Sequence, residues 1–358
     1  MKPASWLALV SFAALGFLVS PAPAQQPRVE NARMETRAVS GGFENIFQGL
    51  VAAQSSPAWI GYAVPVIKGD RQSCCWSNDV RGCFLEPHSG NETITVNGNP
   101  TVRLEGPTHL MVLFRVENRQ IGKVRSFTPD CELDGGGLPF LWLTGVTGAD
   151  SVKVLLGIAK DTAGATREQL RRADSAVSAI ALHADPSADS ALDELIAVNQ
   201  PDQVRRQAIF WIGNARGQHG IDVVTRVARE DPNDKMREHA MFALTQSKDP
   251  KALSVVVDMA HNDKNARVRG QALFWLAQRA GQKVAQSAIT DAITNDPETE
   301  VKKKALFALT QMPSGEGIPM LIQVARTNHN AEVRKQAMFW LGQSKDERAL
   351  RYIEEVLK

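Results

Sequence analysis

Five segments of nine residues recur at an almost constant interval in the second half of the chain. They start at positions 204, 236, 268, 301 and 333, so the intervals are 32, 32, 33 and 32 residues. Each segment has alanine at its fifth position and phenylalanine at its seventh. A unit of this length has room for two helices but cannot bury its apolar side alone. The repetition therefore predicts about six helical hairpins that stack into a solenoid.

A basic residue occupies the second position of every segment. On a helical wheel it falls within the apolar arc, where a cation needs a partner. Six residues earlier, every repeat has aspartate or asparagine. We expect these groups to form a ladder of hydrogen bonds along the stack, and the alternative is a row of solvated surface charges. The ladder residues are Asn199, Arg205, Asp231, Arg237, Asp263, Arg269, Asp296, Lys302, Asn328 and Arg334.

Aromatic residues follow the repeat as well. The recurring phenylalanine lies off the core face of the wheel, which predicts packing between repeats, with an exposed binding strip as the alternative. The next position alternates between large and small side chains. We expect each tryptophan to fill the space that a neighbouring alanine leaves, and the alternative is a surface row of indoles. The alternating residues are Trp211, Ala243, Trp275, Ala308 and Trp340.

This pattern resembles the HEAT-repeat family, and more narrowly the short HEAT-like repeats shared with phycobilisome lyases. The resemblance rests on the spacing from Asp263 to Arg269, on Val268 before that arginine, and on Ala272 and Leu276. It covers residues 167–358, with a degenerate first unit. It implies an all-α solenoid over residues 165–358. Deoxyhypusine hydroxylase, a HEAT-like enzyme, holds iron with His-Glu pairs on its repeats, and this sequence has no such pairs.

Residues 25–148 have the composition of strands and turns. Trp59–Ile67 is rich in β-branched and aromatic residues, and Thr93–Val96 alternates before an Asn-Gly turn signal. The segments 109–116 and 121–127 are expected to pair as a hairpin, and a short helix is expected at 44–53. Residues 149–164 are expected to form a linker with a short helix at 151–158. The predicted class is therefore α+β, a small β-rich domain followed by the solenoid.

All four cysteines, Cys74, Cys75, Cys83 and Cys131, lie in the N-terminal half. An even number favours two disulfides in an oxidising compartment. Because neighbouring cysteines pair poorly with each other, we expect Cys74 and Cys75 to pair outward, one with Cys83 and one with Cys131. The alternative is a zinc site that includes His88, although the spacing lacks the paired Cys-x-x-Cys of structural zinc.

The first 24 residues have the features of a cleaved signal peptide. Lys2 precedes an apolar run from Trp6 to Val19, and a small-x-small site ends at Ala24. The run is short for a membrane span, so no span is expected after cleavage. The sequence thus predicts an exported bacterial protein, periplasmic or secreted. The formal charge of +2 gives no electrostatic case for nucleic acid.

The sequence has no catalytic motif and implies no cofactor. We expect a non-enzymatic scaffold that binds a protein or peptide of the cell envelope on the concave face of the solenoid. The alternative is an envelope enzyme or small-ligand-binding protein with its site in the β-rich domain, near Trp76 and the segments 59–62 and 140–142. The candidate partner-binding residues on the second helices are Asp222, Arg226, Arg229, Asp258, His261, Gln286, Asp291, Gln323 and Arg326.

Overall fold

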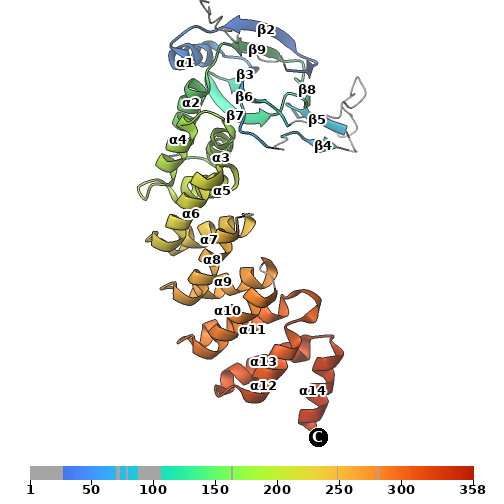
Figure 1. The fold of residues 1–358 in the computed structure, drawn as a ribbon. Coiled ribbons are helices and arrows are strands. Elements are labelled where there is room, and N and C mark those ends of the chain that lie inside the picture. The colour runs from blue at the N-terminus through green and yellow to red at the C-terminus, as the bar shows by residue number, and fades with distance from the viewer. Residues whose placement is uncertain are drawn as a thin grey trace, which may run out of the picture.

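The computed structural model has a sheet-rich N-terminal part followed by a long stack of helices (Figure 1). It describes residues 27–69, 73–77, 80–87, 106–162, 164–247, 249–279 and 282–358. The predicted α+β class, with a helical solenoid after a disulfide-containing sheet region, is confirmed. The predicted signal peptide, the strand at 93–96 and His88 lie outside the described residues. No helix among the described residues is long and apolar enough to cross a membrane.

A five-stranded mixed sheet forms the centre of the N-terminal part, in the order β2-β9-β3-β6-β7. β9 runs parallel to both β2 and β3, whereas β6 is antiparallel to β3 and β7. Seven of the eight residues of β3 are buried because both faces of the sheet are covered. The strands are β2 Arg33–Ala38, β3 Ala58–Pro65, β6 His109–Glu117, β7 Gln120–Phe127 and β9 Pro139–Thr144.

A second, smaller sheet covers one face of the first. Its order is β1-β8-β5-β4 (Figure 1). Cys83 lies on β5, and the other three cysteines lie directly before β4 or β8. Between the two sheets lies a compact core that includes Trp59, Trp142 and Cys131. The strands are β1 Val29–Glu30, β4 Trp76–Ser77, β5 Val80–Phe84 and β8 Glu132–Asp134.

The expected hairpin between residues 109 and 127 is present. Its two-residue turn consists of Asn118 and Arg119, whose φ angles are 52° and 62°. Two successive residues with positive φ are typical of tight two-residue hairpin turns. Backbone bonds to Ser55 and Gln54, after helix α1 (Phe43–Ala53), hold the turn in place.

Six helical hairpins make up the solenoid, α3/α4 to α13/α14. The first helices stack on one another, and each packs on its own second helix. The first helices are α3 Arg167–Leu182, α5 Asp202–Ala215, α7 Asp234–Gln246, α9 Ala266–Arg279, α11 Thr299–Thr310 and α13 Ala331–Gln343. The second helices are α4 Ser187–Ile196, α6 Gly217–Glu230, α8 Pro250–Asn262, α10 Gln282–Asn295, α12 Ile318–Thr327 and α14 Glu347–Leu357, and a 3₁₀ turn, η1 Pro313–Gly315, precedes α12.

Helix α2 (Gly148–Lys160) joins the sheet to the solenoid. It extends beyond the short helix expected at 151–158 and packs on α3, α4 and the sheet. Val66 forms a β-bridge with His183, and Ile67 N donates to Leu182 O at 2.9 Å. One hydrophobic core therefore runs from Phe43 in α1 to Tyr352 in α14 without interruption.

Candidate binding surfaces

Buried arginines link successive hairpins through hydrogen bonds to aspartates. Arg237 on α7 donates to both carboxylate oxygens of Asp263 at 2.7 and 2.9 Å, and to the carbonyl oxygen of Asp231 at 2.9 Å. Arg269 does the same with Asp296 and the carbonyl of Asp263. Arg205 donates to the carboxylate of Asp231. The bond to Asp263 raises the pKa of Arg237 above its ordinary value. Each arginine thus ties its first helix to the end of its own second helix through a carboxylate, and to the preceding hairpin through a backbone carbonyl.

Hydrogen bonds of the expected ladder are present between its central residues. The carboxylates that accept from Arg237 and Arg269 lie 26 and 27 residues later, at the end of the second helix of the same hairpin. The carbonyl six positions earlier lies at the end of the preceding hairpin. Both ends of the ladder depart from this pattern. Arg205 donates to Ile196 O rather than to Asn199, and Lys302, with a single ammonium, donates to Thr294 O. Arg334 donates to the carbonyl of Asn328. The side chain of Asn328 instead accepts from the backbone N–H of Asn330.

An unbroken chain of aromatic rings runs along the first helices. Phe210 stacks on Phe242 at 6.3 Å, and Trp275 packs on Phe242 at 5.1 Å between ring centres. Ala243 is buried, and the expected filling of its space by a neighbouring indole stays a prediction. The rings are only partly buried, so they both pack between repeats and show one edge to solvent. The successive rings are Trp211, Phe210, Phe242, Trp275, Phe274, Phe307, Trp340 and Phe339.

The nine predicted partner-binding residues all lie on second helices. Asp222, Arg226 and Arg229 are on α6, while the others are on α8, α10 and α12. An ion pair connects α6 to α8, with Arg229 3.4 Å from Asp258, and His261 on α8 lies 3.3 Å from Asp291 on α10. We define the exposed side of α6, α8, α10 and α12 as the second-helix face.

Histidine–carboxylate pairs occur across hairpins, which the sequence analysis did not anticipate. His219 lies 3.3 Å from Asp193, and His261 lies at the same distance from Asp291. The partners are 26 and 30 residues apart, so no local motif reveals them. Among the described residues, neither pair belongs to a cluster of three or more metal-ligating groups.

A shallow hollow of about 620 Å³ lies on the second-helix face between α10 and α12. Three predicted partner-binding residues, Gln286, Asp291 and Gln323, line it. The other lining residues are polar apart from Met320, so the hollow suits hydrogen-bonding groups rather than an apolar anchor.

A larger hollow of about 850 Å³ lies where the sheet meets the solenoid. Its lining comes from α1, the β6–β7 turn, α2 and the start of α3. Phe47, Val51 and Ile158 give it an apolar part, and Arg119 and Glu168 are among its charged residues. Sequence reasoning missed this hollow because four separate segments build it. The aromatic segments proposed for a site in this domain are core instead, since Trp59, Tyr62 and Trp142 are fully buried.

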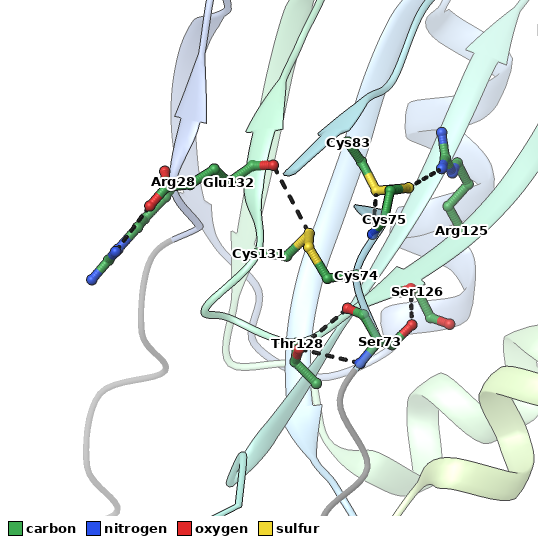
Figure 2. Close-up of a disulfide and its surroundings, with 10 residues drawn as sticks. All are labelled: Arg28, Ser73, Cys74, Cys75, Cys83, Arg125, Ser126, Thr128, Cys131 and Glu132. Carbon is green, nitrogen blue, oxygen red and sulfur yellow. Dashed lines mark hydrogen bonds and ion pairs between the residues drawn. A yellow bond between two sulfur atoms is a disulfide. The ribbon is translucent and has the colours of Figure 1, made fainter. Parts of the chain in front are cut away.

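The adjacent cysteines pair outward. Cys74 is bonded to Cys131 and Cys75 to Cys83 (Figure 2). The sulfurs of Cys74, Cys83 and Cys131 lie within 4.8 Å of one another. All four thiols are committed to disulfides, so the arrangement is that of a covalent brace rather than of zinc ligands.

Comparison with known proteins agrees with the repeat geometry. A family model described as HEAT repeats matches residues 188–277 and 287–358. The hairpins of this segment are HEAT repeats, and the C-terminal half of the chain belongs to the HEAT-repeat family. No curated relative matched the sequence.

Several solved structures are similar to this chain at a low level. Human deoxyhypusine hydroxylase in complex with glycerol is 16% identical, with 58% of this chain and 76% of that chain covered and a TM-score of 0.28. The CpcE–CpcF complex of phycocyanin lyase from Nostoc sp. PCC7120 is 17% identical, with 53% and 76% covered and a TM-score of 0.29. Kap95p, described with RanGDP, is 16% identical, with 53% and 29% covered and a TM-score of 0.34. Likenesses of this size carry no information on activity or partners.

Proposed function

We propose that this protein is a non-enzymatic scaffold that binds a protein or peptide on the second-helix face, at the concave side of the solenoid. The observation that carries the proposal is the continuity of that face over four helices, with exposed polar and charged side chains that contact one another between hairpins. HEAT-type solenoids offer extended surfaces of this kind, which suit an extended partner. The mixture of both charge signs favours a polar peptide segment over nucleic acid.

Charge reversal tests which surface binds. The face variant combines Arg226→Glu with Arg326→Glu, and the control combines Lys235→Glu with Lys335→Glu on the first helices α7 and α13. All four side chains are exposed, so both variants change the net charge equally. Crosslinking of the full chain in the cell envelope should recover the same partner with wild type and control, and much less with the face variant. Equal recovery by both variants would place binding elsewhere.

We also propose export to the periplasm or beyond, supported by the signal-like N-terminal sequence and the two disulfides. Cell fractionation with N-terminal sequencing tests this proposal. A mature chain that begins at Gln25 supports cleavage, and a cytoplasmic chain that begins at Met1 refutes it.

The 850 Å³ hollow at the junction favours a second function, binding of a small molecule that has both an apolar and a polar part. Gly157 lines the hollow, and a Cβ added at this position would meet no other side chain within 4 Å. Gly157→Phe should therefore obstruct the hollow, whereas Gly342→Phe on α13, also in open space, is a matched control. Native mass spectrometry should detect a bound small molecule in wild type and control but not in the obstructed variant. Absence of any adduct from wild type would count against this function.

A further inference from the structure

The two disulfides close loops of very different length. Cys75 and Cys83 are 8 residues apart, whereas Cys74 and Cys131 are 57 apart. A disulfide restricts the unfolded chain more when it closes a longer loop. Cys74–Cys131 is therefore the stronger structural tie, and Cys75–Cys83 is the one that the fold can more easily open.

A partly buried arginine points at the shorter disulfide (Figure 2). The guanidinium of Arg125 on β7 lies 3.5 Å from Sγ of Cys75, donates to Phe84 O at 3.0 Å and sits over the Phe127 ring. Burial lowers the pKa of Arg125, and no ion pair within the described part of the chain involves it. A buried guanidinium without a carboxylate partner raises the free energy of the folded protein while the disulfide is intact. Arg125 gains an anionic partner once Cys75 becomes a thiolate.

The second sulfur of this disulfide also has a donor. The backbone N–H of Cys75 donates to Sγ of Cys83 at 3.0 Å. Both sulfurs thus already face groups that stabilise negative charge. Groups that stabilise the thiolates favour the reduced form and make a disulfide more oxidising.

We propose that Cys75–Cys83 is a redox-active disulfide that accepts two electrons from the dithiol of a partner. Cys75 is partly exposed and Cys83 is 1% exposed, so an incoming thiolate attacks Sγ of Cys75 and displaces Cys83 as a thiolate. The second thiolate of the partner then attacks the partner's own sulfur in this mixed disulfide and releases Cys75 beside Arg125. The partner dithiol becomes a disulfide, and Cys75 and Cys83 take up its two electrons. Of its two protons, one goes to Cys83 and one to solvent, because Cys75 stays a thiolate beside Arg125.

The neighbouring disulfide, Cys74–Cys131, can exchange with the reduced cysteines. The displaced sulfur of Cys83 lies within 4.8 Å of both Cys74 and Cys131, which is close enough for internal exchange. Each reduced cysteine must therefore be identified, not only counted.

Redox titration of the full, oxidised chain tests the proposal. The protein is equilibrated with glutathione buffers of increasing reducing power, trapped by alkylation and mapped by mass spectrometry. We expect Cys75 and Cys83 to be alkylated together while Cys74–Cys131 stays intact. Reduction of Cys74–Cys131 first, or of all four cysteines in one step, would overturn the proposal.

Arg125→Gln removes the charge, and Arg33→Gln on the exposed strand β2 is the control. We expect the first variant to make reduction of Cys75–Cys83 about tenfold less favourable, which corresponds to about 30 mV. An unchanged equilibrium in a folded variant refutes the role of Arg125.

A second measurement does not depend on that variant. In Cys83→Ser, the alkylation rate of Cys75 should reach half its maximum well below pH 8.5, and a value at or above 8.5 contradicts the proposal.

Discussion

Nε2 of His183 lies 2.7 Å from Oγ of Ser151, and this contact joins the end of the first solenoid helix to helix α2. Nδ1 of His183 lies 2.7 Å from the carbonyl oxygen of Ala179, which can only accept, so Nδ1 carries the proton. The neutral ring then accepts from Ser151, and Tyr62 on β3 donates to Ser151 at 2.8 Å. Every partner is satisfied only while the imidazole is neutral. Burial accordingly lowers the pKa of His183 to about 4.

This contact predicts loss of stability in mild acid. An unfolded histidine has a pKa near 6.5, so the unfolded chain binds the proton first as the pH falls. The stabilising contribution of neutral His183 is complete above about pH 6.5 and is lost progressively as the pH falls toward about 4. We expect about 2 kcal/mol less free energy of unfolding from this residue at pH 5 than at pH 7.5. Urea denaturation at both values measures it, and His183→Gln should remove most of the difference. A variant with the wild-type pH dependence would contradict the assignment.

Arg237, at the centre of the ladder, should contribute far more to the free energy of unfolding than Arg334, at its end. Arg237→Ala leaves the buried carboxylate of Asp263 without its partner, which costs about 3–5 kcal/mol. Arg334→Ala removes bonds to backbone carbonyls only, at a more exposed position, and should cost about 1 kcal/mol. Chemical denaturation of the two variants gives both values. Replacing the pair together, with Arg237→Met and Asp263→Leu, should recover much of the loss, and equal losses for the two single alanine variants would refute the ladder.

The solenoid was predictable because the same pattern of residue types recurs in every repeat of the sequence. Alanine and phenylalanine at fixed positions define which side of each first helix is buried, and every copy of the repeat restates it. The partner of Arg237 was harder to predict. The six-residue spacing to Asp231 is visible along the sequence, whereas the carboxylate of Asp263 approaches Arg237 only when α8 folds back on α7.

The N-terminal sites depend on residues far apart in the chain, so local patterns do not reveal them. Strands β1, β4 and β8 have two or three residues, too few to show a period. Arg125 reaches Cys75 across 50 residues because β7 lies beside the disulfide. The junction hollow likewise exists only after α1, the β6–β7 turn, α2 and α3 meet.

The alternation of tryptophan and alanine predicts that a change of side-chain size in either direction destabilises the fold. Trp275→Ala removes a ring that contacts Phe242 and Phe274 and should cost about 2 kcal/mol, less than a fully buried indole because one edge is exposed. Ala308→Trp puts an indole at a fully buried position and should cost about 1–3 kcal/mol through overpacking. Thermal denaturation of both variants measures these effects. A neutral Ala308→Trp would mean that the size alternation is not a packing requirement.

Side chains of the second-helix face should be removable without loss of the fold. Arg229 and Asp258 are each more than 40% exposed, and solvent screens their pair at 3.4 Å. Arg229→Ala, Asp258→Ala and the double variant should each change the free energy of unfolding by less than about 1 kcal/mol. Because these variants stay folded, any weakening of partner binding would report on the surface itself. A loss of several kcal/mol would instead make the pair part of the structural framework, and the second-helix face would lose its standing as a free binding surface.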